Sequence, residues 1–334
     1  MRSTDIAEVG QFRIRWAAME IDLLSWRPTP DHDRASLEEA LEQACDAKDL
    51  HLSRLATQAV AQHTHRMRAA TTLVAGLGFD PDSAISPLPD ELTNAAVAVE
   101  LVHIGAVTHD DVIDDVFRRG DNPTVNADAG NLQAILAGDF LMARASEYAA
   151  THGTRVAQIL AETIGWISEG RARQLQQTGE ARPTPTERLD TLDIRHASLH
   201  DTAAVIGALV TGTHDTDGFG SFGRHLGMAM AIHEDVRRLA HGDPSTGADN
   251  LDDLRRGFWT LPATLAGPDL IDSAQSGDDL DAVHNRLLGE PLDEALSIAR
   301  DHLDKASGIG SDLGLLAGGA LDSIGAALDS LTAD

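Results

Sequence analysis

The feature that most constrains the fold is an apolar stretch with helical periodicity that ends in a dense group of carboxylates. From Glu91 to Ile113, apolar side chains recur at the spacing of an amphipathic helix. The run HDDVIDDVFRRG, from His109 to Gly120, begins at the end of this stretch. On a helix, Asp110 and Asp114 project from one face, where like charges four positions apart repel each other. Because the helix dipole also disfavours anions at this end, the carboxylates require a bound cation or another source of positive charge.

The residue types in this run predict a cation site for a phosphate-bearing ligand. Carboxylate oxygens with no cysteine nearby are the ligands that Mg²⁺ prefers, and this ion usually bridges carboxylates to substrate phosphates. Arg118 and Arg119 follow the carboxylates and carry forked donors that suit phosphate oxygens. The alternative from spacing alone is a solvated acidic helix end followed by a basic turn.

The composition predicts an all-α protein. Aromatic residues make up only 4% of the chain, and β-branched runs are short, so strand signals are weak. No linker rich in Pro, Gly and Ser divides the 334 residues. We therefore expect one large helical domain, residues 35–334, preceded by a helical extension, residues 1–34.

Charge and cysteine content narrow the expected partners and location. The net charge of −27 argues against nucleic acid or an anionic membrane surface as a partner, because both bind positive surfaces. Neither an apolar run long enough for a membrane span nor a signal peptide is recognisable. Cys45 is the only cysteine, which excludes an intramolecular disulfide and indicates a cytoplasmic protein. Lys48 and Lys305 are the only lysines, so nearly all positive charge is arginine.

The carboxylate run and its continuation, HDDVIDDVFRRGDNPTVNADAGNLQAILAGDFLMARA, resemble the first aspartate-rich region of the trans-isoprenyl diphosphate synthases, or polyprenyl synthetases. That family carries DDxxD followed by RRG and PT. The residues that fall in step are Asp110, Asp111, Asp114, Arg118, Arg119, Gly120, Pro123, Thr124, Gly138 and Asp139. The resemblance implies an isoprenoid-synthase-type helical bundle around a central cavity. It also implies that Asp110, Asp111 and Asp114 are catalytic residues that bind Mg²⁺.

The resemblance further implies which side chains hold the substrate diphosphates. The family has Gly-Gly-Lys-Arg-x-Arg where this chain has His63 to Arg68, so His65 stands in place of the lysine. The expected diphosphate-binding residues are His65, Arg66, Arg68, His103, Arg118 and Arg119. Gly105 and Ala106 occupy positions that line the family's alkyl pocket, and their small size favours a product of C20 or longer.

Other family motifs are altered. In the second metal-binding region Glu234 replaces the first Asp, Asp235 is kept and Arg238 replaces the last Asp. We expect Glu234 and Asp235 to bind metal, with an ion pair between Glu234 and Arg238 as the alternative for Glu234. Asp201 and Phe258 replace two further phosphate-binding lysines, so lysine is missing from three motifs.

Three functions remain open from the sequence. The first is head-to-tail elongation of an allylic diphosphate with isopentenyl diphosphate. The second is cyclisation of a prenyl diphosphate by a class I cyclase derived from this fold, which loss of the lysine at His65 favours. The third is a non-catalytic or regulatory subunit that associates with an active paralogue, which Asp201, Arg238 and Phe258 favour. The resemblance implies a homodimer or a heteromer with such a paralogue.

Overall fold

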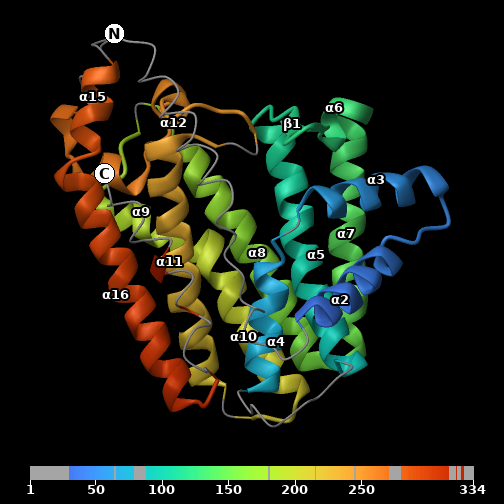
Figure 1. Cartoon of the computed structure of the whole chain (residues 1–334). Helices are drawn as coiled ribbons and strands as arrows, with labels where there is room; N and C mark the ends of the chain where they lie inside the picture. The colour runs from blue at the N-terminus through green and yellow to red at the C-terminus, as the bar shows by residue number, and fades with distance from the viewer. Residues whose placement is uncertain are drawn as a thin grey trace.

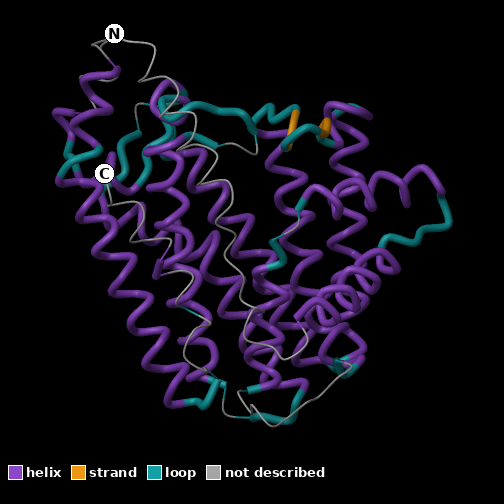
Figure 2. Tube along the Cα trace, viewed as in Figure 1, coloured by secondary structure: helices purple, strands orange, loops and turns teal. Residues whose placement is uncertain are grey.

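The computed structural model describes residues 30–63, 65–78, 88–179, 181–214, 216–243, 246–270 and 280–315, together with residues 321, 325 and 326. Within these residues the chain is almost entirely helical, which confirms the expected all-α class (Figures 1 and 2). The helices are α2 Pro30–Ala44, α3 Leu50–Gln62, α4 Met67–Leu77, α5 Asp90–Ile113, α6 Val125–Ala129, α7 Asn131–Thr151, α8 Thr154–Gln176, α9 Pro185–Leu192, the π-helical turn η1 Asp193–Ala197, α10 Ser198–Val210, α11 Asp217–His241, α12 Asp252–Arg255, α13 Leu261–Leu265, α15 Leu280–Leu287 and α16 Glu290–Asp312. A short antiparallel hairpin joins β1, Arg118–Arg119, to β2, Asn122–Pro123.

The long helices pack in a series that crosses the molecule. Helix α7 packs on α5, α5 on α4, α4 on α10, α10 on α11 and α11 on α16 (Figure 1). Helix α8 contacts α10 and η1 and lies behind the gap between α5 and α11 in this view. The acidic end of α5, the hairpin and α12 all lie at one end of the bundle.

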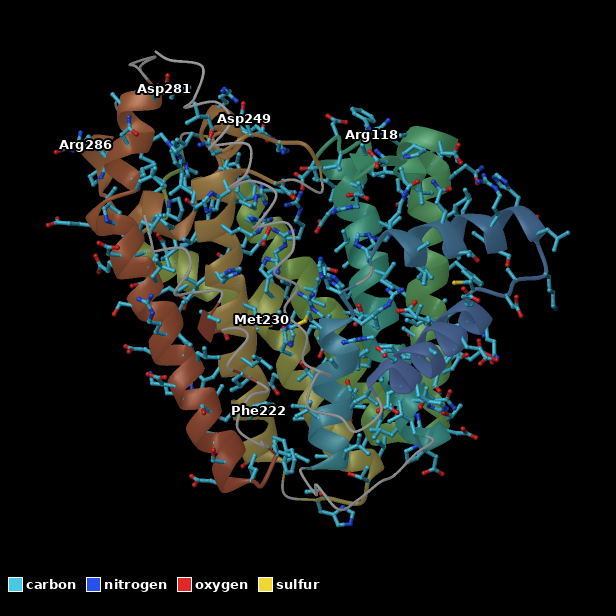
Figure 3. All side chains as sticks on the ribbon, viewed as in Figure 1. Arg118, Phe222, Met230, Asp249, Asp281 and Arg286 are labelled. Atoms are coloured by element: carbon cyan, nitrogen blue, oxygen red, sulfur yellow. The ribbon has the colours of Figure 1, made fainter. Side chains whose placement is uncertain are left out.

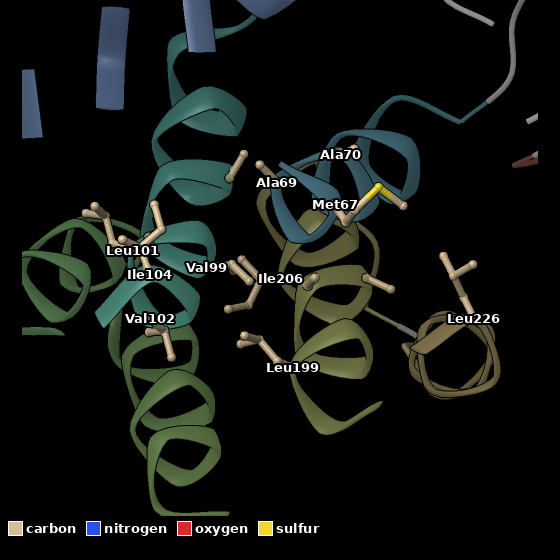
Figure 4. Packing of buried hydrophobic residues seen from close by; sticks show 14 of the residues in the cluster. Met67, Ala69, Ala70, Val99, Leu101, Val102, Ile104, Leu199, Ile206 and Leu226 are labelled. Atoms are coloured by element: carbon tan, nitrogen blue, oxygen red, sulfur yellow. The ribbon is translucent and has the colours of Figure 1, made fainter. Parts of the chain in front are cut away.

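The core consists mainly of small and aliphatic side chains from these helices. Figure 4 shows Ala69 of α4 on the side that faces α5, and Val99 of α5 and Ile206 of α10 meeting between their helices. Glycines allow the closest helix crossings: a Cβ on Gly207 of α10 would lie 2.2 Å from the carbonyl oxygen of Thr72 on α4. These crossings fix α4, α5 and α10 relative to one another, and with them the side chains that the sequence singled out.

Three local expectations can be compared with the structure. The helix expected from Glu91 to Ile113 is present as α5. From Ser36 to Val60 the sequence predicts a single helix, with Ser36 as its N-cap. This prediction is wrong, because the chain forms α2 and α3 instead, and Asp49 caps α3 by accepting from the backbone N–H of Leu52 at 2.9 Å. The polar, Pro-containing segment from Thr178 to Glu187 predicts a loop, but this loop ends early, because Thr184 and Glu187 form a capping box that starts α9.

Helix α2 crosses the boundary expected between residues 34 and 35. The rest of the predicted extension, residues 1–29, lies outside the described residues. Among the helices that are described, none has the length and apolar character needed to cross a bilayer.

Candidate active site

The carboxylate run lies where α5 ends and the chain turns back. Asp114 is the C-terminal cap of α5, and its backbone N–H still donates to the carbonyl oxygen of Asp110. Asp115 adopts a left-handed conformation with φ of 52°, which ends the helix and leads into the hairpin. Figure 3 shows Arg118 of β1 at the same end of the molecule as Asp249, which precedes α12. The end of α5 therefore lies near two other segments of the chain, the hairpin and the region around α12.

Asp110 and Asp114 are each held by two arginines. Arg171 of α8 places Nε 3.1 Å from Asp110 and Nη2 2.7 Å from Asp114. Arg195 of η1 donates to the second oxygen of Asp110 at 2.7 Å. Arg256, after α12, donates to Asp114 at 3.1 Å. The side chains of Asp110 and Asp114 remain 20% and 22% exposed, so a ligand can still reach them.

Asp111 has a different environment from its two neighbours in the motif. It is buried and accepts two hydrogen bonds from Arg119, at 2.6 and 3.3 Å. Burial raises the pKa of Asp111, and the guanidinium of Arg119 opposes that rise. This pair anchors the hairpin to α5 and holds Arg119 at the site.

A second group of expected residues meets between α4 and α5. Arg68 donates from Nη1 to Nε2 of His103 at 3.2 Å; since arginine has no acceptor, His103 is neutral with its proton on Nδ1. Burial and then the charge of Arg68 lower the pKa of His103 well below its usual value. His63 lies edge-on to His103, with ring centroids 6.1 Å apart, and burial lowers its pKa to about 3. These side chains form a cationic patch with uncharged imidazoles beside it.

The remaining expected diphosphate contacts lie elsewhere. Arg66 is buried and donates to both carboxylate oxygens of Glu38 at 2.7 and 2.8 Å and to the carbonyl of Val60 at 3.0 Å, so its guanidinium anchors α2 to the start of α4. His65 is exposed. Arg118 is exposed and donates to the carbonyl of Asp121 within the hairpin at 2.7 Å.

In the second motif the carboxylates are engaged in ion pairs. Asp235 accepts three hydrogen bonds from Arg188 of α9, at 2.7, 2.8 and 3.1 Å, and one from the backbone N–H of Leu261 at 2.9 Å. Glu234 pairs with Arg237, at 2.7 and 2.9 Å. The expected alternative partner, Arg238, instead pairs with Asp253. The expected pair between Glu234 and Arg238 is therefore wrong, because Arg237, three positions after Glu234, forms the ion pair instead.

Two of the positions that lack lysine have defined contacts. Asp201 accepts from Arg224 of α11 at 3.0 Å. The ring of Phe258 lies under the guanidinium of Arg188, 5.9 Å from the ring centroid. Both lysines of the chain, Lys48 and Lys305, are exposed. No lysine therefore reaches the site from the described residues.

Of the two expected pocket residues, Gly105 lies on the side of α5 that meets α7. A Cβ on Gly105 would lie 3.0 Å from the carbonyl oxygen of Gly138 and 3.0 Å from Cγ of Met142. The close approach of α7 thus explains why position 105 is small. Ala106 is half-buried against the core. A role for either residue in chain length stays a prediction.

The donor chemistry at the end of α5 fits Mg²⁺, whereas that of the second motif does not. Within the described parts of the chain, no three Asp, Glu, His or Cys side chains converge as a ready-made metal site. Asp110 and Asp114 nevertheless supply hard oxygen donors on one face, and Mg²⁺ in proteins is commonly held by one or two carboxylates plus substrate phosphates. Asp235 is less accessible than these carboxylates, because its side chain is only 10% exposed and accepts four hydrogen bonds from Arg188 and the Leu261 amide.

The family of the chain follows from comparison with known proteins. The sequence profile described as polyprenyl synthetase matches residues 49–275. The chain belongs to the polyprenyl synthetase family. Nonaprenyl diphosphate synthase of Mycobacterium tuberculosis (strain ATCC 25618 / H37Rv) is 31% identical over 238 residues, which cover 69% of this chain and 67% of that protein. Heptaprenyl diphosphate synthase component 2 of Geobacillus stearothermophilus is 30% identical over 237 residues, which cover 70% of this chain and 72% of that protein.

Solved structures show that this chain has the all-α fold of the isoprenoid synthases. The polyprenyl synthase of Caulobacter crescentus CB15, crystallised with calcium and isoprenyl diphosphate, superposes with a TM-score of 0.78 over 93% of this chain and 96% of that chain. The sequences are 24% identical, so this likeness concerns the fold.

Sequence reasoning missed the arginines that contact the carboxylate motif. Arg171, Arg195 and Arg256 lie on three separate elements, and each reaches α5 only through tertiary packing. The one available signal was the repulsion between Asp110 and Asp114, which demanded positive charge without saying where it comes from.

Proposed function

We propose that this polyprenyl synthetase elongates an allylic diphosphate with isopentenyl diphosphate, head to tail, to a product of C20 or longer. The observation that carries the proposal is the presence of two separate cationic patches along α5. One surrounds Asp110 and Asp114, and the other is the Arg68 and His103 pair. His103 precedes Asp110 by two helical turns, about 10 Å along the axis, which separates two diphosphates rather than crowding them into one site. The relatives named as long-chain diphosphate synthases support the same reaction.

In this proposal the residues near Asp110 bind the allylic diphosphate, which is the leaving group. Mg²⁺ held by Asp110 and Asp114 would supply charge that makes this diphosphate easier to release. Arg119, held by Asp111, presents its remaining donors to the second diphosphate together with Arg68. Cleavage of the C–O bond leaves an allylic cation, the double bond of isopentenyl diphosphate attacks it, and the released pyrophosphate accepts the proton lost from the new chain.

The neutral state of His103 is part of the proposed chemistry. With its Nε2 accepting from Arg68, the imidazole orients that guanidinium without adding positive charge beside a developing cation. The expected dimer or heteromer and the cytoplasmic location remain parts of this proposal.

The test is to incubate the purified chain with Mg²⁺ and allylic diphosphates from C5 to C20, with and without isopentenyl diphosphate, and to identify products by mass. Longer diphosphates that form only with isopentenyl diphosphate support elongation. Hydrocarbons or alcohols formed without it would instead identify a cyclase. A chain that consumes neither substrate under any of these conditions contradicts both.

A second candidate is a subunit that needs an active paralogue. The ion pairs of Asp235 with Arg188 and of Glu234 with Arg237 favour this function, because they leave the second motif without free carboxylates to bind metal. The relative named as component 2 of a heptaprenyl synthase is also consistent with a multi-component enzyme. Turnover that appears only after a paralogous chain is added identifies this function.

A further inference from the structure

Arg171 and Arg195 bring positive charge to the site from α8 and η1, two elements that none of the sequence motifs connects with the site. Their side chains are 9% and 12% exposed, so both cations are largely removed from water. A hydrogen bond also fixes Arg171, whose Nη1 donates to Gln174 on the same helix at 3.0 Å. Buried guanidiniums are costly unless they are paired, so their placement beside Asp110 and Asp114 requires an explanation.

The pairing with the carboxylates leaves donor capacity unused. Nε and Nη2 of Arg171 lie within ion-pair distance of Asp110 and Asp114 but do not form geometrically acceptable hydrogen bonds to them. Both nitrogens are buried. A fixed fork with unsatisfied N–H groups is suited to an anion with several oxygens, such as a phosphate.

Guanidinium groups are dense around the motif. Within the described residues, four of them contact the three motif carboxylates: those of Arg119, Arg171, Arg195 and Arg256, of which Arg256 also pairs with Asp252 at 3.8 Å. Arg171 and Arg195 both contact Asp110, so these two largely buried cations lie close together. They repel each other, and an added anion would relieve that repulsion.

The second motif does not supply the metal charge that would otherwise balance a diphosphate. Asp235 is closed by Arg188, Glu234 is paired with Arg237, and lysine is missing from the site. Positive charge from another source is needed to bind a group with three or more negative charges. Arg171 and Arg195 contact the face of α5 that carries Asp110 and Asp114, and they supply this positive charge.

We propose that Arg171 and Arg195 bind the diphosphate leaving group directly and replace the metal charge that the altered second motif cannot hold. This inference rests on the proposed function for the identity of the diphosphate. Without ligand, the two arginines neutralise Asp110 and Asp114; with ligand, their N–H groups turn to phosphate oxygens and the carboxylates become available to Mg²⁺. A consequence is that part of the diphosphate affinity persists without any metal.

The test measures binding of inorganic pyrophosphate to the full chain by calorimetry, once with Mg²⁺ and once with EDTA. The variants are Arg171→Gln and Arg195→Gln, and Arg173→Gln is the matched control, because Arg173 is an exposed arginine on the same helix. We expect measurable binding in EDTA that each site variant weakens about tenfold or more, the loss of one charge-assisted contact. Arg173→Gln should bind as the wild type does.

Unchanged pyrophosphate affinity in Arg171→Gln and Arg195→Gln overturns the proposal. Tighter Mg²⁺-dependent binding of pyrophosphate by these variants also overturns it, because the arginines would then only block the carboxylates from the metal. Arg171→Lys and Arg195→Lys keep the charge and should retain part of the affinity, which decides the matter if a Gln variant does not fold. Because the assay needs no turnover, pyrophosphate binding without product formation would refute elongation and leave the arginine site standing.

Discussion

Replacing Asp235 by Asn should destabilise the fold by an amount that the structure allows us to work out. Arg188 is 3% exposed and Asp235 10% exposed, and three hydrogen bonds of 2.7 to 3.1 Å join them. Removing one partner of a buried pair leaves an uncompensated charge and typically costs about 3–5 kcal/mol. Since the backbone N–H of Leu261 also loses a charged acceptor, Asp235→Asn should reach that range.

The assay is urea unfolding followed by far-UV circular dichroism, in EDTA and in Mg²⁺. A structural role predicts the same loss in both. The double replacement Arg188→Met with Asp235→Leu should recover most of the stability, because no charge then remains buried. Glu234→Gln is the matched control: its pair with Arg237 is half-exposed on the Glu side, so its loss should cost at most about 1 kcal/mol.

The reasoning is refuted if Asp235→Asn costs less than about 1 kcal/mol in EDTA yet removes the stabilisation that Mg²⁺ and pyrophosphate give to the wild type. In that case Asp235 would be a metal ligand, and the second motif would be intact in function despite the pairing with Arg188.

Three further predictions concern the motif, pH and packing. Asp110→Asn should abolish turnover, whereas Asp115→Asn, at an exposed position whose left-handed backbone Asn tolerates, should leave it within about twofold in a product assay. The pKa of His63 is about 3 in the folded chain and 6.5 in an exposed histidine, so the unfolded chain takes up the proton first as pH falls below 6.5. Urea unfolding at about pH 5 should therefore show a loss of about 2 kcal/mol that His63→Gln removes, and an equal pH slope in that variant would exclude His63 as its source. Gly207→Ala should destabilise by about 1–3 kcal/mol because its Cβ meets the Thr72 carbonyl, while Gly165→Ala, with open space at α8, should stabilise by about 0.5–1 kcal/mol in the same denaturation assay.

The sequence was sufficient for the fold class and the α5 motif because both depend on local patterns. The apolar period from Glu91 to Ile113 is a property of one helix, and the spacing of Asp110 and Asp114 alone puts them on one face. The break between α2 and α3 was missed because an apolar period continues through it, and the cap at Asp49 is a short-range signal that this period obscured.

Roles that depend on tertiary contacts could not be derived in the same way. Arg66 and Arg68 are alike in the sequence, yet one is closed by Glu38 and the other lies against His103. Likewise, one of the two arginines that hold Asp110 is Arg195, which lies 85 positions further along the chain. Only the packing of α8 and η1 on the bundle determines which of the many arginines reaches the carboxylates.

The most direct measurement is a crystal structure of the full chain with Mn²⁺ in place of Mg²⁺ and a non-cleavable allylic diphosphate, since anomalous scattering then locates the ion. We expect the ion on the oxygens of Asp110 and Asp114, and the diphosphate between it and the guanidiniums of Arg171 and Arg195. A diphosphate bound away from the end of α5, with all of these ion pairs unchanged, would contradict the account.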